Sequence, residues 1–354
     1  MTKKLSYHNV NKTPYLTWNW LKMNASTVEL REPEQGAQTE FAPAGALTFQ
    51  DIAGNWPDVE TGMGSDLDRF LEPIPGTLAD LAAGETMASP ALAVFRFAPG
   101  ATRGSRLLIH AGAGSTLALA VLCGSSAPGA GAAALQIKIK ADANATVRLY
   151  LLQTLDDAAT GLIDVGAVCG EGAAFELTRM ELGAGRLYAG CLADLAGKGS
   201  GFTAQVGYFA RAGQRLDMNY VARHRGKRTT CRMDSTGVLA GDAFKLFRGS
   251  IDFLPGCAGA KGEEQEDVLL LGEEVTNQTI PLILCGEEDV EGNHGATIGR
   301  LDERMLFYLA SRGIPAQQAR RLLAHARVDA LAQRLPQALA EEVRRFMEEY
   351  GNEL

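Results

Sequence analysis

Histidine and cysteine are the residues of this 354-residue chain that could bind a soft or borderline metal ion. The six cysteines are scattered singly and form no CxxC pair, so the sequence contains neither a zinc-ribbon nor a ferredoxin-type ligand run. Isolated thiols of this kind are mostly small buried side chains in a reducing compartment. They are Cys123, Cys169, Cys191, Cys231, Cys257 and Cys285. A metal site in this chain would need ligands that folding brings together.

His294 is the candidate metal ligand, and the family resemblance described below is what selects it over the other histidines. A neutral imidazole suits iron, and histidine can replace cysteine on a cluster iron. A single histidine is more often a structural residue, so its chemistry alone does not assign the role. Cys285, His224 and His325 are weaker candidates, and we expect His325 to face solvent or a partner on its helix.

Two common catalytic patterns are absent from the sequence. Gly197-Lys198 and Gly226-Lys227 lack the glycine five residues earlier that a Walker A loop requires, so any ATP chemistry must come from another subunit. No G-x-S-x-G elbow occurs, so a serine hydrolase is unsupported.

Short runs of alternating apolar and polar residues fill the middle of the chain and predict strands with one buried face. These runs are residues 135–140, 146–151, 175–180, 202–208 and 215–220. Three strands begin near Thr146, Ala174 and Phe202, about 28 residues apart, which is typical of a solenoid. No long helical pattern interrupts them, which argues against a doubly wound α/β fold. A sandwich remains possible from strand content, but we favour a β-helix-like stack.

The ends of the chain differ from this middle part, and we predict three regions: residues 1–88, 89–298 and 299–354. The first has a segment rich in aromatic residues at 14–24, which we expect to pack on the core, and short helical patterns near 66–71 and 77–82. The last is helical.

The C-terminal helices have clear start and stop signals. Gly313 ends the first helix, whereas Pro315 and Pro336 each open the next one. The apolar residues predict two buried stripes, which could face the core or a partner. One stripe is Ala319, Leu322, Leu323, Ala326 and Ala330, and the other is Leu339, Val343, Phe346 and Met347.

The charge balance limits the classes of partner. The formal net charge is -8, which argues against nucleic acid or an anionic membrane as partner. The basic cluster at 223–228 is more often a solvated edge than a phosphate site. No apolar run reaches the roughly 20 residues of a membrane helix, and no secretory signal is seen at the N-terminus. We therefore expect a cytoplasmic protein.

One long segment resembles a known family. Residues 282–303 read LILCGEEDVEGNHGATIGRLDE and continue into LFYL at 306–309 and SRGI at 311–314. This run is similar to the closing signature of the SufB/SufD family, and weaker agreement extends upstream to WNWLK at 18–22. The chain resembles a SufD-like member most, because a SufB-type cysteine pattern is missing. SufD proteins often have a cysteine two residues before the histidine, where this chain has Gly292.

The resemblance implies a mainly β protein. It would have a right-handed parallel β-helix core, a mixed N-terminal region and a small C-terminal α-helical domain. It implies a scaffold, not an enzyme, that pairs with a SufB-type subunit or a second copy and docks a SufC-type ATPase. A transient iron–sulfur cluster or iron would be shared with the partner, with His294 as ligand at the dimer interface. For the ATPase we expect a docking surface made of Leu306, Phe307, Tyr308, Arg312, Gly313 and Ile314.

A carbohydrate-active lyase or hydrolase is the alternative that the fold suggests, because parallel β-helices also host such enzymes. Their sites need clustered carboxylates, often with calcium or an arginine base. Asp217, Asp234 and Asp242 are candidates, but their spacing does not force them onto one face.

Overall fold

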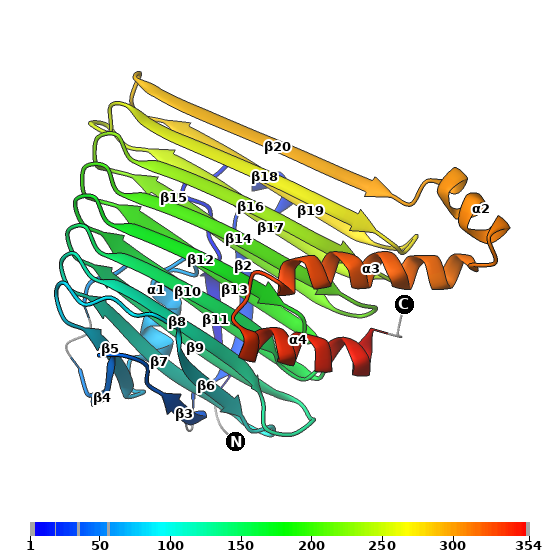
Figure 1. Ribbon diagram of the computed structural model, residues 1–354, viewed down its shortest axis with the longest axis horizontal. Coiled ribbons are helices and arrows are strands. Elements are labelled where there is room, and N and C mark those ends of the chain that lie inside the picture. The colour runs from blue at the N-terminus through cyan, green and yellow to red at the C-terminus, as the bar shows by residue number, and fades with distance from the viewer. Residues whose placement is uncertain (1–3, 18, 34–35, 55–56, 352–354) are drawn as a thin grey trace.

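The computed structural model describes residues 4–17, 19–33, 36–54 and 57–351. Its centre is a parallel β-solenoid of about eight turns, formed by two nine-stranded sheets that face each other (Figure 1). Strands that follow one another along the solenoid alternate between the two sheets. The prediction of a mainly β protein with a parallel β-helix core and a small helical part is confirmed.

We name each sheet after its last strand. The β20 sheet contains β3 (Gln38–Ala42), β6 (Ala91–Phe97), β8 (Thr116–Ser125), β10 (Thr146–Thr154), β12 (Ala174–Glu181), β14 (Gly201–Ala210), β16 (Thr230–Leu239), β18 (Ala260–Leu270) and β20 (Val290–Arg300). The β19 sheet contains β4 (Thr48–Ile52), β5 (Gly76–Leu81), β7 (Thr102–Ala111), β9 (Gly131–Ala141), β11 (Ala159–Cys169), β13 (Arg186–Leu195), β15 (Arg215–His224), β17 (Phe244–Phe253) and β19 (Thr276–Cys285). Pairing is parallel except at the N-terminal end, where β3 and β4 pair antiparallel with β6 and β5.

The stack follows the spacing that the sequence shows. Thr146 is in register with Ala174, and Ala174 with Gly201. Equivalent residues of successive turns therefore lie above one another, and their inward side chains form one continuous apolar core. Phe175 and Phe202 stack in this way, with ring centroids 5.3 Å apart.

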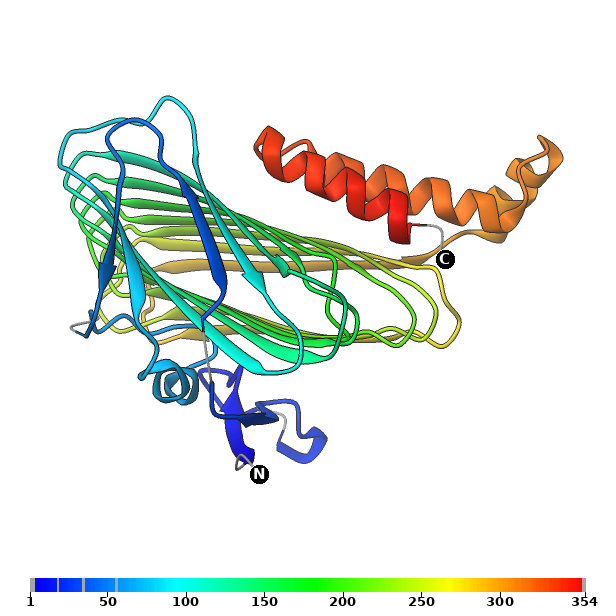
Figure 2. The ribbon, with the colours of Figure 1, turned by 90° about the horizontal axis from the view of Figure 1, so that it is seen from below.

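The N-terminal region lies against the outer face of the β19 sheet (Figure 2). It contains β1 (Lys4–Val10) paired antiparallel with β2 (Ser26–Arg31), the short 3₁₀ helix η1 (Asn19–Leu21) and α1 (Ser65–Leu71). The helix predicted near 66–71 is confirmed as α1, but the helix predicted at 77–82 is wrong because this segment forms β5. Ala79 and Leu81 are buried at alternate positions, which is the period of a strand.

The aromatic segment near the N-terminus does not pack on the core as we expected. Trp20 is 76% exposed and Tyr15 65% exposed, whereas Trp18 lies outside the described residues. The polar contacts of neighbouring residues hold this segment on the sheet instead, as described below.

Three helices follow the solenoid: α2 (Glu303–Ser311), α3 (Ala316–Ala332) and α4 (Gln337–Tyr350). Figure 2 shows α3 and α4 side by side along one face of the solenoid, with α2 beyond them. That face is the outer side of the β20 sheet, where Phe209, Val238 and Leu269 pack against the helices.

The stripe predicted for α4 is buried, as expected. The stripe predicted for α3 is wrong in part: Leu322 is 52% exposed, and the buried residues are Ala319, Ala324, Val328 and Ala332. Contact with β14 and β16 selects the face of α3 that is buried. The α4 stripe and the buried face of α3 are therefore part of the chain's own core, whereas Leu322, Ala326 and Ala330 of the predicted α3 stripe are exposed.

Candidate functional site

The last turn of the solenoid leaves an open end. β20 pairs with β18 and β19 pairs with β17, and each is the terminal strand of its sheet (Figure 1). Along β20 no residue is buried. A terminal strand of ten or more residues presents a row of backbone N–H and C=O groups that another chain can pair with.

His294 lies on this terminal strand, and its side chain is exposed. In the parallel register of β18 and β20, it is the partner of Glu264. Side chains in register in a sheet point to the same side, and the Glu264 carboxylate lies against Gly249 of the facing β19 sheet. His294 therefore belongs to the interior side of the solenoid, at the point where the interior opens to solvent.

A buried polar cluster lies directly beneath the open end. The Lys245 ammonium contacts the Glu266 carboxylate and donates to Thr279 Oγ1 at 3.1 Å. Thr279 Oγ1 in turn donates to Glu266 Oε2 at 2.7 Å. Burial lowers the pKa of Lys245, and the charge of Glu266 opposes that effect. This pair is satisfied by its own contacts.

Glu264 differs from its neighbours in this cluster. It is 3% exposed, and its Oε2 has no hydrogen-bond partner within the described part of the chain. Burial, followed by the charge of Glu266, raises the pKa of Glu264 to about 7, although Lys245 acts in the opposite direction. At neutral pH this carboxyl group is thus divided between its protonated and ionised forms.

Sequence reasoning identified His294 but missed this cluster. A signal was present: Glu264 and Glu266 alternate with Gln265 and Asp267 in a strand that ends in apolar residues, so two acids had to face inward. Glu264 lies beneath His294 because 30 residues separate the two along the chain. The length of the turns between β18 and β20 determines that separation.

The described residues contain no group of three or more His, Cys, Asp or Glu side chains that could hold a metal ion. Gly292 faces inward, and a side chain there would meet Ile283 and Phe253. Cys285 is exposed but lies on β19, in the other sheet. A complete ligand set around His294 would therefore need groups from outside the described residues.

The other candidate ligands are structural in their surroundings. His224 is buried, its Nδ1 lies 2.7 Å from Thr229 Oγ1, and burial lowers its pKa to about 4. Five of the six cysteines are buried free thiols. Burial raises the pKa of Cys169 to about 12, so this thiol stays protonated and unreactive. His325 is half-buried on α3.

The predicted docking surface lies on α2 and the turn after it. Phe307 is 76% exposed and Tyr308 is 55% exposed. The Arg312 guanidinium lies 5.2 Å from the centre of the Tyr308 ring, and Gly313 ends the helix with a φ of 82°. Leu306 and Ile314 are half-buried, and α2 packs against α3. The exposed members of the predicted surface are therefore Phe307, Tyr308, Arg312 and Gly313.

The carboxylates proposed for a carbohydrate-active enzyme do not converge. Asp217 lies on β15 of the β19 sheet, whereas Asp234 lies on β16 of the other sheet and pairs with Arg232 at 2.9 Å. Asp242 accepts a hydrogen bond from the backbone of Gly213 in a turn. A glycosidase needs two carboxylates on either side of one bond, and these three cannot supply them.

The basic cluster at 223–228 is partly neutralised by acidic residues. Arg223 pairs with Glu60 at 3.1 Å and Arg225 with Asp194 at 2.9 Å.

No helix in the described ranges is long and apolar enough to cross a membrane.

Comparison with known proteins identifies the family. The model "SUF system FeS cluster assembly, SufBD core domain" matches residues 96–327, which is well over half of the chain. The iron–sulfur cluster assembly protein SufD of Bacillus subtilis is 31% identical over 135 residues, which cover 38% of this chain and 27% of that protein. A SufBD family protein of Mycobacterium leprae is 30% identical over 140 residues, covering 40% and 16%. A SufBD family protein of Staphylococcus epidermidis is 28% identical over 161 residues, which cover 45% of this chain and 34% of that protein.

These matches span about a third or less of each relative. The SufBD core match nevertheless includes the open end with His294 and the polar cluster beneath it, and the chain belongs to the SufBD family of iron–sulfur cluster assembly proteins.

Proposed function

We propose that this chain is a SufD-like scaffold subunit of a SUF iron–sulfur cluster assembly complex, with no catalytic activity of its own. Iron or a nascent cluster is the cargo of this scaffold. The observation that carries the proposal is the position of His294 on the terminal strand β20, within the SufBD core match. One edge of β20 pairs with β18, and its other edge has no partner strand among the described residues. The similarity to a SufD protein of Bacillus subtilis supports the D-type assignment.

The open end is the surface that pairs with a second scaffold subunit, which is either a SufB-type protein or a second copy of this chain. A partner strand would satisfy the free backbone groups of β20. It would also bring ligands to His294, whose own chain offers no complete set within the described residues. Imidazole from one subunit and a thiolate from the other would suit a nascent iron–sulfur cargo.

The surface around Phe307 and Tyr308 docks a SufC-type ATPase. Exposed aromatic residues next to an arginine are typical of the central residues of protein interfaces. The complex works in the cytoplasm, where a reducing environment keeps thiols free. All six cysteines of this chain are free, which agrees with that location.

Co-expression with SufC-type and SufB-type proteins tests the proposal. We expect His294→Ala to keep the complex but to lose iron and the visible absorbance of a cluster after anaerobic purification. Phe307→Asp should lose the ATPase and keep the scaffold partner. His8→Ala, which changes an exposed histidine on β1, is the control for the first variant and should behave as the wild type.

Point variants are better suited to this test than a truncation before Leu301. Removing the helices would uncover Phe209, Val238 and Leu269 on the β20 sheet and could cause aggregation. If the wild-type chain captures neither protein, the scaffold proposal is wrong. If His294→Ala retains full iron and absorbance, His294 is not a ligand.

A further inference from the structure

One cleft of the described chain lies on the outer face of the solenoid and reaches the terminal strand β19 at Gln278. It has a volume of about 520 Å³ and lies between the segment 21–27 and the outer face of the β19 sheet. Clefts of this volume are typical of small-molecule sites. Its sheet side is formed by β13, β15, β17 and β19, and its other wall is the N-terminal segment.

Two arginines come together on the sheet side of this cleft. Arg186 begins β13 and Arg215 begins β15, and the two are in register. Neighbouring strands lie about 4.8 Å apart, so the backbones of these two like-charged residues are one strand spacing apart, and the Arg215 side chain extends toward Phe244 of β17. Neither arginine has an acidic partner among the described residues, in contrast to Arg223 and Arg225 of the basic cluster. A like-charged pair of this kind favours binding of an anion.

The other groups of the cleft add to this preference. The Arg215 guanidinium stacks 4.1 Å from the centre of the Phe244 ring, which fixes its orientation. Lys22 supplies a third cation from the opposite wall. Tyr188 also lines the cleft, and burial and the charge of Asp217 raise its pKa, so its hydroxyl group stays protonated and able to donate.

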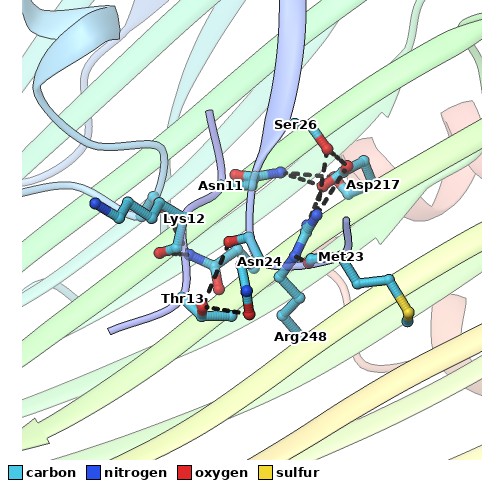
Figure 3. A network of polar contacts seen from close by, with 10 residues as sticks. Asn11, Lys12, Thr13, Met23, Asn24, Ser26, Asp217 and Arg248 are labelled. Carbon is cyan, nitrogen blue, oxygen red and sulfur yellow. Dashed lines mark hydrogen bonds and ion pairs between the residues drawn. The ribbon is translucent and has the colours of Figure 1, made fainter. Parts of the chain in front are cut away.

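The one acid of the cleft is already neutralised. The carboxylate of Asp217 contacts the Arg248 guanidinium and the Ser26 hydroxyl, and it accepts a hydrogen bond from Asn11 Nδ2 at 2.8 Å (Figure 3). Arg248 also donates to the backbone oxygen of Met23 at 2.7 Å. This network fastens the segment 11–26 to the sheet, and it holds the wall that carries Lys22 over the two arginines.

We propose that the cleft binds a small anion that carries a diphosphate group, with Arg186 and Arg215 holding the phosphates and Lys22 closing the site from the opposite wall. The two arginines start from backbones one strand spacing apart, and side chains of this length can each donate to one phosphate of a diphosphate. Leu21 and Met23 give the wall an apolar part, which an organic group attached to the diphosphate would contact. This site lies on the outer face of the β19 sheet, whereas His294 lies on β20 in the other sheet, and it does not depend on the scaffold function.

Isothermal titration calorimetry of the full chain with inorganic pyrophosphate and with ADP tests the proposal. The double variant Arg186→Gln/Arg215→Gln should bind pyrophosphate at least about tenfold more weakly than the wild type. Arg148→Gln is the matched control, because Arg148 is an exposed arginine near the start of β10 on the other sheet. Circular dichroism and the Tm of each variant show whether the fold is intact.

Equal affinity for pyrophosphate and ADP would support recognition of the diphosphate alone, whereas tighter binding of ADP would support a contact with the organic part as well. The proposal is overturned if the wild type shows no binding at millimolar pyrophosphate. It is also overturned if the folded double variant binds as well as the wild type, or if Arg148→Gln loses as much affinity as the double variant.

Discussion

His294 stands one solenoid turn above Glu264, in direct register between β20 and β18. The exposed candidate ligand therefore has a buried carboxyl group with an unsatisfied oxygen beneath it. Sequence spacing alone does not show this relationship, and it has a consequence for stability that can be measured.

We expect Glu264 to make stability fall as the pH rises from about 4.5 to about 7, whereas His224, whose pKa burial lowers to about 4, acts in the opposite direction. The pKa of Glu264 is raised from 4.5 to about 7 by burial and by Glu266, so this group binds more protons in the folded state than in the unfolded state in this range. Glu264→Gln should remove this contribution and stabilise the protein above pH 7, by roughly 1–3 kcal/mol. Asp164, also buried with a pKa raised to about 7, leaves a residual slope in the variant.

Urea unfolding between pH 5 and pH 8 measures this effect. Glu85→Gln, an exposed acid in a turn, is the control and should follow the wild type. An unchanged slope in Glu264→Gln would show that this carboxyl group does not titrate in the range.

The sequence predicts the solenoid well because the strand patterns recur along it at a regular spacing. Alternation at 146–151 and 175–180 predicts strands with one buried face, and β10 and β12 follow these bounds closely. The spacing of about 28 residues predicts the stack. The helix predicted near 77–82 is wrong because the strand that forms there, Gly76–Leu81, has only six residues, too few positions to distinguish the two periods.

The sequence does not predict contacts that depend on register or on a choice between two apolar faces. Asp217 and Asn11 are 206 residues apart and meet only because the N-terminal segment crosses the sheet. Leu322 belongs to an apolar stripe of α3, yet the face with Ala324 and Val328 packs on the sheet. The family resemblance identifies His294 as a possible ligand, whereas its place on an open edge is a property of the whole stack.

The ion pair between Arg248 and Asp217 should hold the N-terminal segment on the solenoid. Arg248 is fully buried, so Arg248→Met leaves Asp217 without its counter-charge in a buried network and should destabilise the protein by about 3–5 kcal/mol. Hydrogen exchange should increase in the segment 11–26 before the rest of the chain.

A second change separates charge from packing. Adding Asp217→Asn to Arg248→Met removes the unpaired charge and should recover part of the lost stability. Arg148→Gln, which breaks an exposed pair with Glu176, should cost less than about 1 kcal/mol. Equal losses for Arg248→Met and Arg148→Gln would show that the buried pair has no special role.

Gly62 should tolerate no side chain, because a loop of the N-terminal region crosses β13 at this point. A Cβ at Gly62 would lie 2.0 Å from the backbone nitrogen of Cys191. The Gly62 backbone also accepts a hydrogen bond from Asn219 Nδ2 at 2.8 Å and donates to the Val165 oxygen. Gly62→Ala must push two backbones apart, and we expect a loss of at least about 2 kcal/mol in urea unfolding.

Gly299 provides the matched control for that change. It lies on β20, and a Cβ there would meet no atom within 4 Å. Gly299→Ala should change stability by less than about 1 kcal/mol, and a gain is possible because alanine restricts the unfolded chain. If Gly62→Ala is equally mild, the close crossing of the loop over β13 is wrong.

Phe346 and Phe307 should differ sharply when each is replaced by alanine, because one is part of the core and the other is not. Phe346 is 7% exposed and packs on Tyr350, with ring centroids 4.7 Å apart and the Arg211 guanidinium 5.1 Å from its ring centre. Phe346→Ala should cost about 3–5 kcal/mol, since it leaves a cavity between α4 and the β20 sheet. Phe307→Ala should change stability by less than about 0.5 kcal/mol, since its ring is 76% exposed.

Urea unfolding of the two variants gives these values, and capture of the SufC-type ATPase separates stability from docking. Phe307→Ala should weaken capture while its unfolding curve matches that of the wild type. A large loss of stability in Phe307→Ala would mean that the ring is packed within the chain and is not free to meet a partner. Full capture by a stable Phe307→Ala protein would instead place the ATPase on another surface.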